Sequence, residues 1–271
     1  TYAEASVRIL TGFIEPHFFA GFSGGPKAVV PGVAGGELVM DNHSARMLDH
    51  PNATWGVTEG NPLWEEMLES ALATQPTFLL NVTLNRDRAI TGVYAGDLQA
   101  AHRVGKEAVR QTAMVTVEEP FDIVITSNSG YPLDLNLYQA VKGMSAAAQI
   151  VREDGAIIIA AECWDGIPAH GEYGNILRMA DSPKALLELV RQPDFRMMDQ
   201  WQAAIQARIQ CQAEVYVKTG HLSDEEIESA LLAPVERIEE TLATLLARYG
   251  PDARICVLPE GPQTIPYIQR R

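Results

Sequence analysis

Apolar residues recur along this chain with two different spacings, and the two spacings alternate. Short apolar runs predict buried strands, whereas apolar residues at every third or fourth position predict helices. The predicted strands are 77–84, 90–94, 121–126, 155–161, 214–218 and 254–258. The predicted helices are 37–48, 62–68, 97–114, 137–150, 183–191, 199–210 and 234–249, with one more beginning at Ser223. Strands that alternate with helices favour an α/β fold with a mostly parallel sheet flanked by helices.

Polar residues and glycines support several of these boundaries. Asn61 stands before Pro62, a proline position typical of a first helical turn, and Asp97 is placed to cap the helix predicted at 97–114. His102 is expected on the exposed face of that helix. The strand 121–126 ends in a Ser-Asn-Ser-Gly loop, and loops at such strand ends are where α/β proteins place ligands.

Composition narrows the class of protein. The chain has 271 residues, 46% of them hydrophobic, which is enough for one or two domains. Its net charge of −14 argues against nucleic-acid binding, which needs a basic surface. No apolar run is long enough to cross a membrane and no secretory signal is recognisable, so a soluble, cytoplasmic protein is expected. Three widely spaced cysteines, expected to be reduced, agree with that compartment: Cys163, Cys211 and Cys256.

The segment from Gly12 to Gly36 holds the most unusual residue choices of the chain. Seven glycines fall within it, so its backbone can bend sharply and approach a ligand closely. His17 and Lys27 lie in this predicted loop, and His43 is expected to project from the helix that follows. One concave site could collect these three side chains.

Each of the three residues also has an ordinary interpretation. Loop histidines commonly make structural hydrogen bonds, and lysines are usually solvated. A nucleotide phosphate loop is a poor alternative, because only three residues separate Gly21 from Gly25. In addition, Ala28 stands where that motif has the Ser or Thr that binds magnesium.

The segment Pro16–Lys27, followed by Asn42–His43, resembles the central motif of the LarA-type lactate racemases, which use a nickel-pincer nucleotide. The resemblance implies that Lys27 is joined covalently to this cofactor and that His43 ligates the nickel. It implies that His17 is a catalytic acid/base. It also implies that the fold resembles the C-terminal domain of these racemases, with cofactor-biosynthesis proteins as partners. Cofactor loading of the chain as prepared would depend on those proteins.

These implied roles agree with the chemistry of the side chains. A lysine amine of lowered pKa can form an amide-like bond with an activated carbonyl. A neutral imidazole is a good nickel ligand, and sulfur and carbon donors of the cofactor could complete a square-planar geometry. His17, with an ordinary pKa of about 6.5, can take and return a hydroxyl proton near neutral pH.

A second group of candidate site residues lies near the start of the helix predicted at 137–150. Tyr138 or Gln139 would share a helix face with Lys142, which by itself is typical of a solvated surface. The family has a matching Tyr-Gln-x-x-Lys stretch, and the resemblance implies that Gln139 and Lys142 hold the substrate carboxylate while Tyr138 shapes the pocket. A family tryptophan beside the cofactor corresponds to Trp201, although a helix tryptophan is more often a core residue.

The resemblance runs from Gly12 to Pro262 and implies that residues 1–271 are the C-terminal domain of a longer enzyme. The family's upstream N-terminal domain supplies a second catalytic histidine and an arginine, and that domain is expected to be absent from this chain. The chain alone should therefore be incomplete for catalysis.

The implied activity is that of an isomerase, a 2-hydroxy acid racemase or epimerase. Hydride would leave C2 of the substrate for the cofactor and return to either face of a planar 2-keto acid. Two alternatives stay open. The chain could be a cofactor- or metal-binding module without racemase activity, or an enzyme that forms a Schiff base at Lys27.

Overall fold

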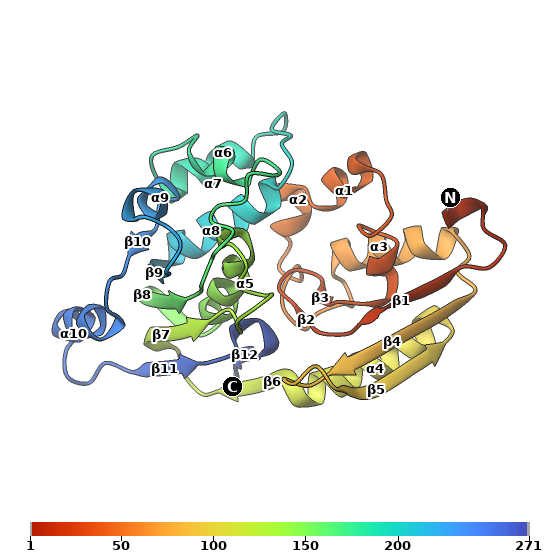
Figure 1. The fold of residues 1–271 in the computed structure, drawn as a ribbon, viewed down its shortest axis with the longest axis horizontal. Helices are drawn as coiled ribbons and strands as arrows, with labels where there is room; N and C mark the ends of the chain where they lie inside the picture. Colours follow the sequence, from red (N-terminus) through yellow and green to blue (C-terminus); the bar gives the residue numbers. More distant parts are fainter. Residues whose placement is uncertain (1, 270–271) are drawn as a thin grey trace. The chain divides into compact units, whose positions relative to one another are not determined.

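Two sheets organise the chain, one in each of two units that meet between Met114 and Val115 (Figure 1). The computed structural model describes residues 2–269. The first unit is Thr1–Met114 and the second is Val115–Arg271. No linker separates the two units, since helix α4 is followed directly by strand β6.

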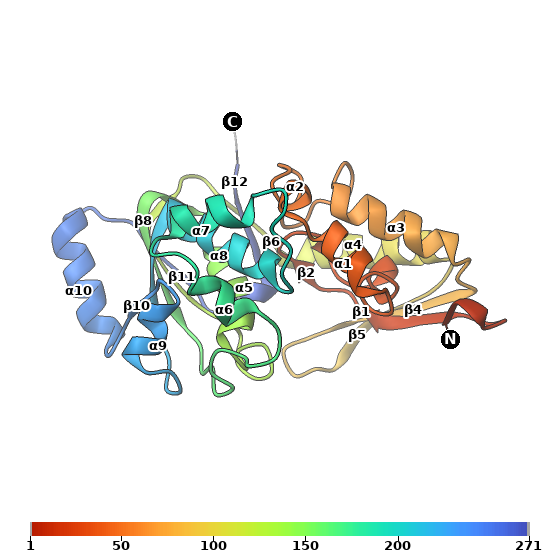
Figure 2. The ribbon, with the colours of Figure 1, turned by 90° about the horizontal axis from the view of Figure 1, so that it is seen from above.

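The first unit is built on a three-stranded mixed sheet in the order β1-β4-β5. Strands β1 (Ile9–Phe13) and β4 (Phe78–Leu84) are parallel, and β5 (Ile90–Gly96) is antiparallel to β4. Helices α3 (Pro62–Ala73) and α4 (Leu98–Ala113) lie on the same side of this sheet (Figure 2). The shorter elements of this unit are η1 (Tyr2–Glu4), β2 (Pro16–His17), β3 (Gly21–Phe22), η2 (Gly25–Ala28), α1 (Gly36–Asn42) and α2 (Ala45–Leu48).

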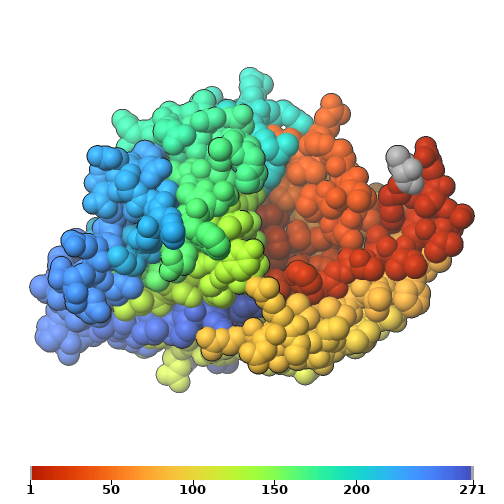
Figure 3. Space-filling model, viewed as in Figure 1, coloured from red at the N-terminus to blue at the C-terminus, as the bar shows by residue number. Residues whose placement is uncertain are grey.

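The other face of the same sheet is apolar and exposed. Alternate residues of β1, β4 and β5 point to this face, and five large apolar ones among them are 38% to 61% exposed. The three strands can be found in Figure 3, where β1 is red and β4 and β5 are orange to yellow. We call this surface the outer sheet face; its large members are Ile9, Phe13, Phe78, Leu80 and Val93.

The second unit is built on a five-stranded parallel sheet in the order β10-β9-β8-β7-β11. Its strands are β7 (Phe121–Ser127), β8 (Val151–Ala160), β9 (Ala213–Lys218), β10 (Ala233–Pro234) and β11 (Ile255–Leu258). Helices α5 (Leu137–Ala148) and α8 (Gln200–Gln212) pack on one face of the sheet, and α10 (Ile238–Tyr249) covers the other. The remaining elements are α6 (Tyr173–Leu177), α7 (Pro183–Val190), α9 (Asp224–Ser229), η3 (Gly261–Gln263) and the pair β6 (Met114–Val117) and β12 (Ile265–Ile268).

The core of the second unit follows from its strand sequences. Strands β7 and β8 contain continuous runs of isoleucine and valine, as expected for parallel strands that are buried on both faces. Ile123, Ala156 and Ile158 pack under α10, whereas Val124 and Ile157 point to the opposite side. The prediction of an α/β fold with a mostly parallel sheet flanked by helices is confirmed.

Two local predictions are wrong. The helix predicted at 37–48 is divided into α1 and α2, because His43 ends α1 and Ser44 begins a new turn. His102 is buried instead of exposed, since it lies in the apolar stripe of α4, four residues after Leu98 and seven before Val109. Among the described residues, no helix is long and apolar enough to cross a membrane.

Candidate functional site

His17, Lys27 and His43 come from three neighbouring structural elements of the first unit. His17 ends strand β2, which forms a small antiparallel hairpin with β3 and pairs His17 with Gly21. Lys27 lies in the 3-10 turn η2, where Pro26 follows the turn's first residue. His43 is the residue that ends α1. A short glycine-rich segment therefore places three chemically able side chains within about thirty residues of sequence.

The ring of Phe19 is the common neighbour of all three. The His17 ring meets it edge-on at 4.5 Å between centroids, and the His43 ring does so at 5.0 Å. The Lys27 Nζ lies over the same ring, 5.5 Å from its centroid. The structure therefore brings the three predicted residues together. We call His17, Phe19, Lys27 and His43 the Phe19 cluster.

His43 is held as a neutral imidazole. Its side chain is buried, and its Nδ1 lies 3.1 Å from the carbonyl oxygen of Val39. A carbonyl can only accept, so Nδ1 carries the hydrogen and Nε2 carries the lone pair. Burial, followed by the positive charge of Lys27, lowers the pKa of His43 to about 3. The ring is therefore neutral at physiological pH, and its Nε2 lone pair is free of a proton that would block metal binding.

His17 adopts the opposite tautomer. The backbone N–H of Ala20 donates to Nδ1 of His17 at 3.2 Å, so in the neutral ring the hydrogen lies on Nε2. In this conformation His17 presents a donor at Nε2. The ring can take a second proton only at Nδ1, which requires the contact with Ala20 to open.

Asn61 holds the segment that carries Phe19 by side-chain hydrogen bonds. Its amide donates to the carbonyl oxygens of Phe19, at 2.8 Å, and Val57, at 2.9 Å. The same side chain caps α3, as the sequence predicted, by accepting from the backbone of Leu63. Sequence reasoning identified the cap but missed this second role, because contacts to residues more than forty positions away leave no local signal.

The predicted residues of the second unit lie at the carboxyl end of its sheet. The strand order reverses between β7 and β11, and ligands of open α/β sheets bind at such a switch point. Helix α5 begins just after the loop that follows β7, with Asn136 as its cap. Gln139 and Lys142 lie in its first two turns. The helix start and its dipole favour an anionic group there.

Tyr138 and Trp201 form one hydrogen-bonded pair in the second unit. The Trp201 indole N–H donates to the Tyr138 hydroxyl oxygen at 2.8 Å, and the Gln202 side chain donates to the Tyr138 carbonyl oxygen. The Tyr138 ring also meets the buried Tyr173 ring edge-on at 5.4 Å. Burial raises the pKa of Tyr138 to about 12, so the phenol stays protonated. Helix α8 thus fixes the start of α5.

The metal-binding capacity of the chain's own side chains is small. Among the described residues there is no group of three or more His, Cys, Asp or Glu side chains that could hold a metal ion. In the Phe19 cluster, His43 offers a neutral imidazole near the Lys27 amine. A metal ion bound there would need further donors from outside these side chains, and imidazole is a ligand for zinc, copper, iron and nickel.

Fold and site together define an α/β protein with a glycine-rich, lysine-bearing loop in one unit and an anion-favouring helix start at the switch point of the other. Known proteins share this organisation. The profile of the "Lactate racemase C-terminal domain" matches residues 116–265, and that of the "Lactate racemase N-terminal domain" matches residues 1–56. The chain belongs to the lactate racemase family.

Individual relatives agree with this assignment. A lactate racemase from Thermoanaerobacterium thermosaccharolyticum is 38% identical over 263 residues, which are 97% of this chain and 62% of that protein. One from Lactiplantibacillus plantarum is 38% identical over 260 residues, 96% of this chain and 61% of that protein. The chain therefore spans about three fifths of the length of these relatives.

Solved structures show the same fold. The lactate racemase apoprotein from T. thermosaccharolyticum superimposes with a TM-score of 0.92 and 37% identity, over 98% of this chain and 64% of that one. A protein from Thermotoga maritima has a TM-score of 0.74 at 17% identity, over 99% of this chain and 68% of that one, which is a likeness of fold alone.

The prediction that residues 1–271 are all C-terminal domain is wrong for the first part of the chain. Residues 1–56 match the N-terminal-domain profile, so part of that domain is present. The C-terminal profile begins at residue 116, next to the boundary of the second unit at Val115. Sequence reasoning missed this boundary because strand and helix signals continue across it without a linker.

Proposed function

We propose that this chain carries the cofactor-attachment and carboxylate-binding parts of a 2-hydroxy acid racemase or epimerase, an isomerase of the lactate racemase type. The observation that carries the proposal is the Phe19 cluster, in which an amine, a neutral imidazole and a second histidine surround one aromatic ring. Membership of the family supports a nickel-pincer nucleotide as the cofactor.

In the first unit, the proposed roles follow from the state of each side chain. Lys27 forms the covalent attachment through its amine. His43 ligates nickel through Nε2, because Nδ1 donates to Val39. When bound, the nucleotide supplies a hydride acceptor and donor for C2 of the substrate.

His17 handles the hydroxyl proton of the substrate. Its Nε2–H first donates to the hydroxyl oxygen and orients it. To take the hydroxyl proton, His17 must present a lone pair in place of this N–H. Either the ring rotates so that Nδ1 faces the hydroxyl, or the hydrogen moves from Nε2 to Nδ1, and both changes open the contact with the Ala20 N–H. The proton returns to the same oxygen after the hydride has come back to C2.

In the second unit, we propose that Gln139 and Lys142 bind the carboxylate of the 2-hydroxy acid. Gln139 offers an amide donor, and Lys142 offers a positive charge, both near the start of α5. Tyr138 is fixed by the Trp201 indole and forms a rigid wall of the pocket. Trp201 is proposed to lie beside the cofactor.

The partners proposed for the complete enzyme are the rest of the N-terminal domain, with its second histidine and arginine, and the proteins that make the cofactor. Two histidines are needed so that either enantiomer can lose its hydroxyl proton. We propose a reducing, cytoplasmic compartment because the three cysteines are free thiols.

The attachment is tested by producing the chain in cells that make the cofactor and measuring its intact mass and nickel content. We expect a nucleotide-sized mass increase that is lost in Lys27→Ala and kept in the exposed control Lys184→Ala. Nickel should be lost in His43→Ala and retained in the exposed control His50→Ala. An unmodified chain without nickel would contradict the proposal.

A second candidate is a cofactor-binding module that lacks racemase activity by itself, because the chain matches only about three fifths of the length of the two lactate racemases. Chiral chromatography of lactate separates the two. Interconversion by the loaded chain supports a complete racemase, whereas a loaded but inactive chain supports the module. Borohydride trapping of a carbonyl substrate at Lys27, without nickel, would instead identify a Schiff-base enzyme.

A further inference from the structure

The backbone just before Lys27 adopts a conformation that side chains rarely allow. Gly24 has a φ of 74° and Gly25 has a φ of 55°, so two successive residues at the start of η2 have the positive φ that favours glycine. Short glycine segments are also the most costly in conformational entropy to hold in one state. The direction of the Lys27 side chain therefore depends on whatever fixes this turn.

Two buried side chains make hydrogen bonds to the turn. The Gly25 N–H donates to Asn81 Oδ1 at 2.8 Å, and His102 Nε2 lies 2.9 Å from the Ser23 carbonyl oxygen. Asn81 is fully buried in β4, and His102 is 3% exposed on α4. Because a carbonyl only accepts, His102 is the donor and carries its hydrogen on Nε2.

The same two side chains also leave no room beside the turn. A methyl group on Gly24 would lie 2.7 Å from Asn81 Oδ1, and one on Gly25 would lie 2.7 Å from His102 Cδ2. His102 is itself held by the Trp64 ring, which stacks on it at 4.9 Å between centroids. The turn thus packs directly against the Asn81 and His102 side chains. Positions 24 and 25 have room only for glycine.

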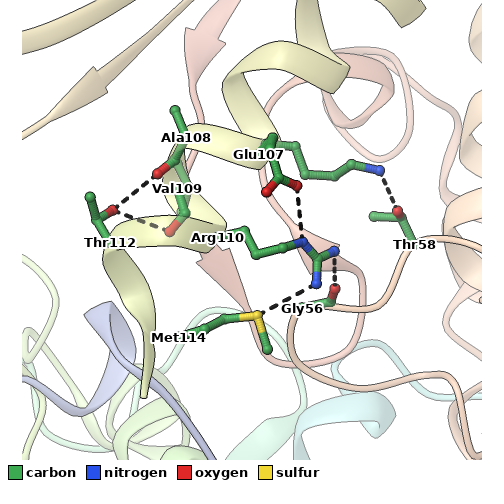
Figure 4. Close-up of polar contacts among 9 residues, drawn as sticks. Gly56, Thr58, Glu107, Ala108, Val109, Arg110, Thr112 and Met114 are labelled. Atoms are coloured by element: carbon green, nitrogen blue, oxygen red, sulfur yellow. Dashed lines mark hydrogen bonds and ion pairs between the residues drawn. The ribbon is translucent and has the colours of Figure 1, made fainter. Parts of the chain in front are cut away.

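Two further residues on the same face of helix α4 also make hydrogen bonds to this part of the first unit. Lys106 and Arg110 follow His102 by four and eight residues, which places the three on one side of the helix. Lys106 Nζ donates to Thr58 Oγ1 at 2.6 Å, and Arg110 Nη2 donates to the Gly56 carbonyl at 2.9 Å (Figure 4).

The segment held by Lys106 and Arg110 supports strand β3, which precedes the turn. The Gly56 N–H donates to the Gly21 carbonyl oxygen at 3.1 Å, and the Arg110 guanidinium lies 5.4 Å from the centre of the Phe22 ring. Helix α4 therefore holds the Gly21–Ser23 stretch at both ends, directly at Ser23 and through residues 56–58 at Gly21.

We propose that His102 and Asn81 are positioning residues that hold the 23–25 turn so that the Lys27 amine is presented for cofactor attachment. Neither residue touches the cofactor in this proposal; both act through the backbone of the turn. The proposal deepens the function proposed above and rests on the role given there to Lys27.

Amide hydrogen exchange of the cofactor-free full chain, detected by mass spectrometry, tests whether His102 and Asn81 hold the 23–25 turn. We expect His102→Ala to speed exchange of the 23–27 amides by about tenfold, the effect of losing one buried hydrogen bond. His102→Gln, whose amide can still donate to Ser23, should restore much of the protection. Arg103→Ala, an exposed neighbour on the same helix, is the matched control and should change nothing.

Two results would overturn the proposal. One is unchanged exchange at 23–27 in both His102→Ala and Asn81→Leu. The other is faster exchange spread evenly over β4 and α3, which would indicate general loosening of the unit. If His102→Ala does not fold, Asn81→Leu provides the test, because it removes the acceptor for the Gly25 N–H and keeps a side chain branched at Cγ.

Cofactor attachment provides the second readout. In cells that make the cofactor, His102→Ala should be modified at Lys27 several-fold more slowly than the unaltered chain, and His102→Gln at nearly the unaltered rate. Equal rates in all three would overturn the positioning role. If the unaltered chain gains no adduct, the proposed function fails, while hydrogen exchange still decides whether His102 and Asn81 hold the turn.

Discussion

The Phe19 ring contacts His17, Lys27 and His43 together, although it can perform no acid/base or ligand chemistry. Its position is fixed by the Asn61 amide on its own carbonyl and by edge-on contacts with the two imidazoles. Edge-on aromatic contacts are directional, so the ring sets the spacing between the three polar groups. Phe19 therefore determines the geometry of the cluster.

Replacing Phe19 separates these groups. We expect Phe19→Ala to lower the free energy of unfolding by about 3–5 kcal/mol, the usual cost of removing a buried phenylalanine. Cofactor loading at Lys27, measured by intact mass, should fall more than this loss of folded protein explains. Phe18→Ala is the matched control, since Phe18 is about as buried as Phe19 and its ring lies tilted against the rings of His17 and Phe19. Equal loading in the two folded variants would contradict the role of Phe19.

His102 makes the first unit sensitive to acid. Burial lowers the pKa of His102 to about 4 in the folded chain, against an ordinary value of 6.5. The unfolded chain therefore binds more protons between these values, so stability is full above pH 6.5 and is lost as the pH falls towards 4. The loss from this one group amounts to at most about 3 kcal/mol.

This pH dependence can be measured by urea unfolding at pH 7, 5.5 and 4.5. His102→Gln should flatten the fall in stability, because glutamine does not titrate. The exposed His50→Gln should leave the fall unchanged. An identical slope in the His102 variant and the unaltered chain would show that other groups carry the acid sensitivity.

At the scale of elements, the close approach of α5 to the ends of β7 and β11 shapes the second unit's candidate site. A methyl group on Gly143 would lie 2.8 Å from the Ser127 carbonyl oxygen and 2.9 Å from Asn128 Oδ1. One on Gly261 would lie 3.0 Å from Gly143 itself. The absence of these two side chains allows the helix that carries Gln139 and Lys142 to sit directly on the strand ends.

Gly143→Ala should push α5 away from β7. We expect a loss of about 1–3 kcal/mol in the free energy of unfolding, the cost of overpacking a filled interior. Circular dichroism during urea unfolding measures it. Gly220→Ala is the control, because the nearest atom to its added methyl group would be at 3.7 Å. A Gly143 variant as stable as the control would mean that the helix shifts at no cost.

The elements themselves were largely predictable from the sequence, because their signals are local. The strand predicted at 121–126 is observed at Phe121–Ser127, and the helix predicted at 137–150 is observed at Leu137–Ala148. Strand β12 was missed, since Ile-Pro-Tyr-Ile has no clear strand pattern and is ordered by pairing with β6.

The candidate site was predictable only in part. His17, Lys27 and His43 stood out because reactive residue types are rare within a glycine-rich segment. Asn81 and His102 did not, because each acts on a backbone group more than fifty residues away. The apolar stripe of α4 did contain a signal for His102, but its polar type led to the opposite prediction.

At the scale of the whole molecule, the outer sheet face should make the folded chain bind hydrophobic molecules in solution. Contiguous exposed apolar surface on this scale is uncommon in monomeric proteins. The chain should bind a hydrophobic dye such as 1-anilinonaphthalene-8-sulfonate in its folded state. Leu80→Lys and Val93→Lys, which place charges on two adjoining strands of this face, should lower the dye fluorescence several-fold.

Met179→Lys provides the comparison for that experiment. Met179 is 51% exposed in the second unit and does not belong to the outer sheet face, so its substitution adds the same charge without interrupting that surface. Dye binding that falls equally in all three variants would show that the dye does not bind on the outer sheet face.

The strand order of the second unit also has a consequence for synthesis on the ribosome. Strands β7, β8 and β9 leave the ribosome in the order in which they pair, so each can join its neighbour as it emerges. The other neighbour of β7 is β11, which is made long after it, once α8, β9 and α10 have appeared. Throughout that interval, β7 has an apolar edge with unpaired backbone groups. Nascent chains halted before Ile255 should therefore be the ones that chaperones hold longest.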